Sequence, residues 1–275
     1  MHAYTVTGEA RHYQQTKPGA KNPSRATNIK DIREQKLLPS VTEICRMLSA
    51  PSLEEYKIGQ VIQACFEDTP SANEDFTNYK RRIQDKAGAD AAGAADLGTL
   101  IHNSLETYYA RHDQWEGTVK VAMPDGREIP IREFVLPAVI EVGKLGIAEE
   151  VCESVVVNPE LGYAGTVDLY GNRTADPSGN KQLVVVDFKS KRTKPGVVVE
   201  PIETHPIQIA AYVGALTPPW SMYFNAEGYN IYISTTEIGR VDVVHYDTET
   251  ISRSQRIFEH LLALWRWRYF DPRQV

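Results

Sequence analysis

The chain has 275 residues, and its 42% hydrophobic and 24% charged residues are ordinary for a soluble globular protein. A formal net charge of −6 excludes a protein that coats nucleic acid through bulk positive charge. Three scattered cysteines, Cys45, Cys65 and Cys152, indicate a reducing compartment without disulfides. No apolar run approaches transmembrane length, so we expect a cytoplasmic protein without a membrane partner.

The N-terminal half is predicted to be mainly helical. Residues 1–36 are polar and partly basic, which is typical of a flexible arm. Residues 41–48 and 53–66 predict two helices. A longer helical pattern follows at residues 79–113, and its glycines predict a broken helix rather than one rod.

The C-terminal half alternates between strand and helix patterns, which predicts an α/β fold. We expect a central mixed sheet flanked by helices, with a helical N-terminal region added. The expected division is a 1–36 arm, a 37–130 helical region and a 131–275 core. In chain order, the expected elements are a hairpin at 118–129, a helix at 131–145, strands at 151–157, 163–171 and 183–189, a helix at 206–216, strands at 229–234 and 240–246, and a helix at 250–269. Aromatic residues in the last helix are expected to pack against the sheet.

Two of these strands each carry an acid. Residues 183–186 are a β-branched run, and side chains alternate along a strand, so Asp187 and Lys189 point the same way while Phe188 points oppositely. A turn-rich segment at 171–180 joins this strand to the one that carries Asp168. The pattern predicts an antiparallel hairpin that brings Asp168 and Asp187 together.

Two carboxylates with a neighbouring lysine are suited to a divalent-metal site that cuts phosphodiester bonds. Mg²⁺ prefers carboxylate and carbonyl oxygens, and the Phe188 carbonyl is a candidate further ligand. Lys189 can position or deprotonate a water, or offset charge on the phosphate. The alternative is a plain Asp187–Lys189 ion pair on an exposed strand. The buried valine run and the second acid favour the metal site.

The spaced motifs Gly-x-x-Asp, Asp-x-Lys and Gln-x-x-x-Tyr resemble the PD-(D/E)XK nuclease superfamily, specifically its RecB-like exonuclease branch. The segment 97–106, which contains His102, looks like that branch's first motif. The segment 39–44 looks like the opening of phage RecB-like exonucleases and of the mitochondrial genome maintenance exonuclease. The resemblance covers roughly residues 37–270, and it implies that the α/β part is a restriction-endonuclease-like core.

The resemblance implies a role for each motif residue. Lys189 would be the catalytic lysine, and Gln208 and Tyr212 would brace the site and the DNA backbone. Glu153 is preferred to Glu150 as an added catalytic acid. The implied metal ligands are His102, Asp168 and Asp187, beside which the Phe188 carbonyl stays the candidate named above.

Simpler alternatives remain for the outer residues. His102 on an amphipathic helix could be a satisfied core residue, and Glu106 could be either its orienting partner or a solvated acid. Gln208 and Tyr212 share a helix face, as a purely structural pair would. Beside the site, substrate phosphates are expected to meet three basic residues: Lys191, Arg192 and Lys194.

We therefore expect a Mg²⁺- or Mn²⁺-dependent DNA exonuclease of a bacterial or phage-infected cell, acting in recombination, repair or replication. Its substrate would be DNA that is single-stranded or has free ends, and a recombination protein is an expected partner. The alternatives are a structure-specific endonuclease and a non-catalytic DNA-binding protein. No iron–sulfur cluster is expected, because such clusters take four cysteine ligands and none follows Cys152.

Overall fold

The computed structural model describes residues 1–17, 19, 21–48, 51–123, 126–174, 179–217 and 225–270, without the side chains of 51–53, 89–95 and 149. A five-stranded sheet of order β11-β10-β9-β8-β7 forms its centre. The strands are β7 (Ala148–Asn158), β8 (Tyr163–Thr174), β9 (Lys181–Lys191), β10 (Ala226–Ser234) and β11 (Val241–Tyr246).

The sheet is mixed, as the sequence predicts. β7, β8 and β9 form an antiparallel meander, and β10 and β11 are also antiparallel. β10 is parallel to β9, a pairing that requires a crossover. The helix α6 (Thr204–Leu216) lies in that connection. The restriction-endonuclease-like α/β core is thereby confirmed.

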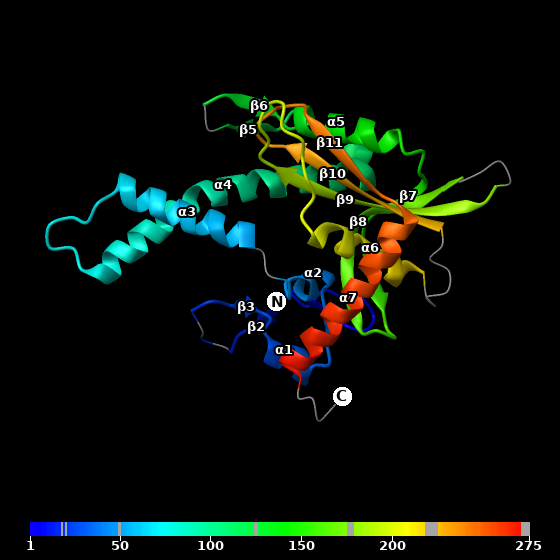
Figure 1. Ribbon diagram of the computed structural model, residues 1–275, viewed down its shortest axis with the longest axis horizontal. Coiled ribbons are helices and arrows are strands. Elements are labelled where there is room, and N and C mark those ends of the chain that lie inside the picture. Colours follow the sequence, from blue (N-terminus) through cyan, green and yellow to red (C-terminus); the bar gives the residue numbers. More distant parts are fainter. Residues whose placement is uncertain are drawn as a thin grey trace.

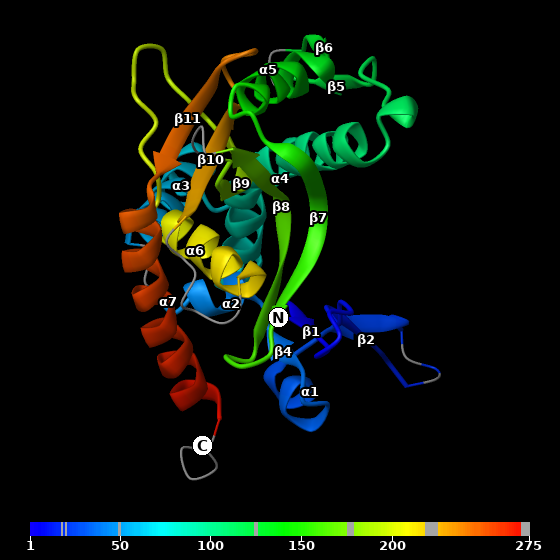
Figure 2. The ribbon, with the colours of Figure 1, turned by 90° about the vertical axis from the view of Figure 1, so that its right-hand side faces the viewer.

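Helices cover both faces of the sheet (Figures 1 and 2). On one face, α4 (Phe76–Ala110) and α5 (Arg132–Gly143) pack on a core that includes Phe188. On the other face lie α2 (Val41–Cys45), α6 and α7 (Thr248–Tyr269). Trp265 of α7 is buried in this core, whereas Trp267 is 68% exposed, so the expected packing role holds for Trp265 but not for Trp267.

The described part of residues 1–36 contains strands and a helix, and some of its residues are buried, which differs from the expected flexible arm. β1 (Ala3–Tyr4) pairs with β4 (Leu38–Pro39), β2 (Tyr13–Gln15) pairs with β3 (Ser24–Ala26), and α1 (Ile29–Glu34) follows. Ala3 and Ile32 have no exposed surface. Only a few apolar residues anchor this polar segment, too few to form a visible periodicity.

Two long helices, α3 (Pro51–Glu67) and α4, form an antiparallel hairpin that projects from the body of the molecule (Figure 1). α4 is continuous, so the prediction of a broken helix was wrong. Gly98 serves close packing instead, because a Cβ there would lie 2.5 Å from Ser190 Oγ on β9. Further along the chain are η1 (His112–Gln114) and the expected hairpin of β5 (Lys120–Ala122) and β6 (Glu128–Pro130). Residues 124–125 of its predicted turn lie outside the described residues.

Within the described ranges, no helix is long and apolar enough to cross a lipid bilayer.

Candidate active site

The β8–β9 hairpin brings the two predicted acids together. Leu169 pairs with Val186, and continuing that antiparallel register places Asp168 opposite Asp187. The backbone N–H of Phe188 donates to Asp168 Oδ2 over 2.7 Å, which links the strands at this point. The hairpin prediction is confirmed, and the connection is shorter than expected because the strands extend to Thr174 and from Lys181.

A cluster of candidate metal ligands forms around Asp168. One ligand atom each of His102, Glu153 and Asp168 lies within 4.8 Å of the others. His102 comes from α4, and its Nδ1 is 3.9 Å from Asp168 Oδ2. Glu153 comes from β7, where the Cys152–Leu169 pair places it beside Asp168. The three elements thus converge on one point at the edge of the helix-covered sheet.

Glu153 has an unusual backbone conformation. Its φ of +46° is in the left-handed region, which residues other than glycine adopt infrequently. Such conformations cost of order 1–3 kcal/mol and are concentrated at functional sites. Sequence reasoning preferred Glu153 to Glu150, and Glu153 is the one found in the cluster.

The electrostatics of this cluster favour a bound cation. Burial, followed by the charges of Glu106 and Asp187, raises the pKa of Glu153 to about 7. Burial and the charge of Asp187 also raise the pKa of Asp168 well above its usual value. Burial lowers the pKa of His102, which keeps its imidazole neutral. A neutral imidazole among crowded carboxylates is a donor set that fits a divalent metal.

Asp187 lies next to this cluster and faces Lys189. Lys189 Nζ is 2.7 Å from Asp187 Oδ2 and 2.9 Å from Oδ1. It also donates to Gln208 Oε1 over 3.2 Å, and Gln208 Nε2 donates to Tyr212 OH over 2.9 Å. Burial lowers the pKa of Lys189, but the charges of Asp187 and Asp168 outweigh burial and the net pKa is raised. Gln208 and Tyr212 therefore hold the lysine in place.

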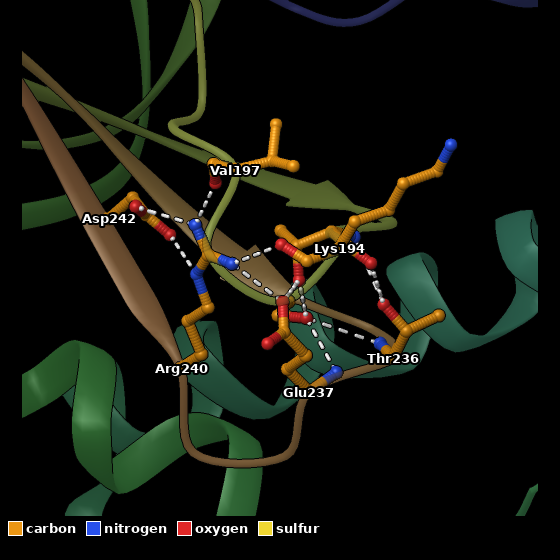
Figure 3. Close-up of polar contacts among 8 residues, drawn as sticks. Lys194, Val197, Thr236, Glu237, Arg240 and Asp242 are labelled. Atoms are coloured by element: carbon orange, nitrogen blue, oxygen red, sulfur yellow. Dashed lines mark hydrogen bonds and ion pairs between the residues drawn. The ribbon is translucent and has the colours of Figure 1, made fainter.

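Of the three predicted phosphate-contacting residues, Lys191 is the last residue of β9, and Arg192 and Lys194 lie in the loop that follows it. Lys191 Nζ donates to the Glu200 carbonyl over 2.8 Å and lies 5.5 Å from the centre of the Tyr232 ring. Arg192 and Lys194 are exposed. The Lys194 side chain extends away from its neighbours (Figure 3).

Arg240 fastens this loop to the β10–β11 turn (Figure 3). Its guanidinium donates to the Lys194 carbonyl over 2.9 Å and to the Val197 carbonyl over 2.6 Å. The same group pairs with Glu237 at 2.6 Å and with Asp242 at 2.8 Å. The basic loop is consequently held at two backbone positions.

Sequence reasoning missed Arg240 and also Asn230, which bonds Asp187. Asn230 had a signal, since it is a polar residue inside the apolar strand pattern of 229–233. Arg240 had none, because an arginine beside a turn is common.

Comparison with known proteins agrees with this geometry. The model of the family "PD-(D/E)XK nuclease superfamily" matches residues 76–274. The chain belongs to that superfamily. A PD-(D/E)XK nuclease hydrolyses nucleic acid, and the superfamily generally uses divalent metals, which the donor set described above fits.

Among solved structures, this PD-(D/E)XK nuclease is similar to "Crystal structure of SSO0001", at 14% sequence identity. The match covers 77% of this chain and 87% of that one, with a TM-score of 0.26. No curated protein matches the sequence.

Proposed function

We propose that this PD-(D/E)XK nuclease is a metal-dependent DNA exonuclease of the RecB-like branch. The observation that carries the proposal is the convergence of His102, Glu153 and Asp168 beside the Asp187–Lys189 pair. His102 belongs to the motif by which the sequence resembles that branch, so its position in the cluster supports the branch assignment. Recombination, repair or replication of DNA in the cytoplasm is the setting we infer.

Each residue has a distinct part in the proposed reaction. His102, Glu153 and Asp168 would hold Mg²⁺ or Mn²⁺, with Asp187 and the Phe188 carbonyl beside them. When bound, the metal supplies Lewis-acid polarisation of the phosphate and acidifies a water. The Lys189 ammonium, fixed by Asp187 and Gln208, would hydrogen-bond the attacking water or the phosphate oxygen on which charge develops. Tyr212 keeps Gln208, and hence Lys189, in place.

The surroundings of the site support a substrate with a free end or a single strand. One arm of the projecting α3–α4 hairpin is α4, the helix that carries His102. This hairpin would form one wall of a DNA channel. Arg192 and Lys194 on the fastened loop would contact phosphates. An endonuclease would use the same chemistry in an open groove, and it remains the nearest alternative.

The test is degradation of end-labelled linear single- and double-stranded DNA beside a covalently closed circle. Each substrate is incubated with Mg²⁺, Mn²⁺ or EDTA. Metal-dependent loss of linear DNA with an intact circle is the expected result, and the labelled products report the strand preference. A cut circle would make the protein an endonuclease, and no cutting with either metal would contradict a catalytic function.

Two variants connect that activity to the site. Lys189→Ala is expected to lower the rate of DNA cleavage at least 100-fold while DNA binding persists. Lys144→Ala is the matched control, because Lys144 pairs with Glu141 on α5 and lies outside the cluster. Equal activity in both variants would contradict the assigned role of Lys189.

A further inference from the structure

Asn230 is a fully buried polar residue in the middle of the sheet. It lies on β10, where its register partner on the parallel strand β9 is Asp187. Its exposed fraction is 0%, and its neighbours Tyr229 and Ile231 belong to the apolar core. A buried amide destabilises a protein unless its polar atoms are hydrogen-bonded, so its bonds indicate why it is there.

The hydrogen bonds of the Asn230 side chain join it to Asp187 and to Tyr246. Its Nδ2 donates to Asp187 Oδ2 over 2.7 Å and approaches the Asp187 carbonyl at 3.2 Å. Its Oδ1 accepts from the hydroxyl of Tyr246 over 2.8 Å. Because an ionised carboxylate only accepts, the amide nitrogen must face Asp187 and the amide oxygen must face Tyr246.

Asn230 and Lys189 together fix the rotation of the Asp187 carboxylate. Lys189 contacts both carboxylate oxygens, whereas Asn230 bonds Oδ2 alone. A lysine by itself is a flexible point charge, and the carboxylate could turn with it. The amide, anchored on a neighbouring strand, prevents that turn. The remaining lone pairs of Asp187 therefore keep one direction.

We propose that Asn230, oriented by Tyr246, is a positioning residue that holds Asp187 for the metal and for Lys189. The inference rests on the proposed metal-dependent nuclease function. It adds a fourth strand, β10, to β7, β8 and β9, which carry Glu153, Asp168 and Asp187. Loss of an outer group that orients a metal ligand typically lowers metal affinity or activity 10- to 100-fold.

The experiment replaces Asn230 with leucine, which is close in size and cannot hydrogen-bond. Mn²⁺ affinity is measured by titration calorimetry without DNA, and kcat and KM are measured on single-stranded DNA. Asn230→Leu is expected to weaken Mn²⁺ binding about 10-fold and to lower kcat 10- to 100-fold, with KM for DNA unchanged. Tyr246→Phe is expected to show a smaller loss of the same kind.

Asn158 provides the matched control. It is also buried, with 1% exposure, and its amide donates to the Gly214 carbonyl over 3.0 Å and accepts from Leu161 N–H over 2.9 Å. Asn158→Leu should lower the thermal midpoint as much as Asn230→Leu does, but leave Mn²⁺ affinity and kcat at wild-type values.

The outcomes separate two failures. If Asn230→Leu keeps wild-type Mn²⁺ affinity and kcat, as Asn158→Leu does, the positioning role is wrong although the nuclease function stands. If the wild-type protein neither binds Mn²⁺ nor cleaves DNA, the proposed function itself is wrong. Should Asn230→Leu fail to fold, Tyr246→Phe gives the same decision, because it removes only a hydroxyl.

Discussion

Gly165 lies directly against the ring of Tyr212. A Cβ added at Gly165 would be 2.7 Å from Tyr212 Cε1, a separation that side-chain carbons essentially never show. The same added Cβ would be 3.3 Å from Val41 Cγ2, so the space around Gly165 is closed by both side chains. The glycine of the Gly-x-x-Asp motif is thus required by the tyrosine of the Gln-x-x-x-Tyr motif.

Gly165→Ala is expected to destabilise the fold by about 1–3 kcal/mol, because the added methyl overpacks a closed site. Cleavage should fall as well, since Tyr212 holds Gln208 and Gln208 holds Lys189. Thermal unfolding and kcat measure the two effects. The control is Gly88→Ala in α4, where an added Cβ meets nothing within 4 Å. It should stabilise by about 0.5–1 kcal/mol without changing kcat. A fully active Gly165→Ala would contradict this coupling.

Glu153→Asn is expected to stabilise the metal-free protein by about 1 kcal/mol, because asparagine tolerates positive φ better than glutamate does. The same change removes a carboxylate from the cluster, so Mn²⁺ affinity should fall at least 10-fold. Unfolding in EDTA and calorimetric titration give the two values. Glu150→Asn should leave Mn²⁺ affinity unchanged. Loss of Mn²⁺ affinity in Glu150→Asn but not in Glu153→Asn would identify Glu150 as the acid instead.

Acid should destabilise the protein through His205. Its Nδ1 is 2.6 Å from the Tyr232 hydroxyl, and burial lowers the pKa of His205 from 6.5 to about 4. Below pH 6.5 the unfolded chain binds a proton that the folded chain resists until about pH 4. Stability should therefore fall between those values, by up to about 3 kcal/mol. His205→Gln should flatten this part of the unfolding free-energy curve against pH, and an unchanged slope would contradict the assignment.

Arg240→Ala should loosen the basic loop after β9. The loop would lose its contacts at the Lys194 and Val197 carbonyls, so trypsin should cut faster after Arg192. KM for DNA should rise several-fold while kcat changes less, because in the proposed function the loop would contact the substrate rather than the metal. Arg132→Ala, which removes an exposed pair with Glu133, is the control and should behave as wild type. Unchanged trypsin cleavage would show that Arg240 does not hold the loop.

The sequence is sufficient to predict the β8–β9 hairpin and the side of it on which Asp187 and Lys189 lie. Those features follow from local rules, the alternation of side chains along a strand and the turn formers between two strands. His102 and Gln208 were identified through motif spacing. Spacing of this kind describes the residues of a single helix and not how that helix packs.

The contact between Asn230 and Asp187 could not be predicted in the same way, because 43 residues separate them and only the parallel β9–β10 pairing joins them. The positive φ of Glu153 leaves no mark on the sequence. The continuity of α4 was missed because a glycine serving close approach to Ser190 looks the same as a glycine that ends a helix. Each of these depends on tertiary packing rather than on local propensity.

Because α4 is continuous, one helix connects the projecting end of the hairpin to the candidate active site. A helix of 35 residues, at 1.5 Å per residue, is about 52 Å long, and His102 lies in its last third. The end where α3 turns into α4 is therefore joined to the His102 imidazole by a single uninterrupted helix. If DNA bound at that end changed the position of His102, it would change metal affinity, and the metal would change DNA affinity by the same factor. The hairpin would in this way report the arrival of a substrate to the catalytic centre.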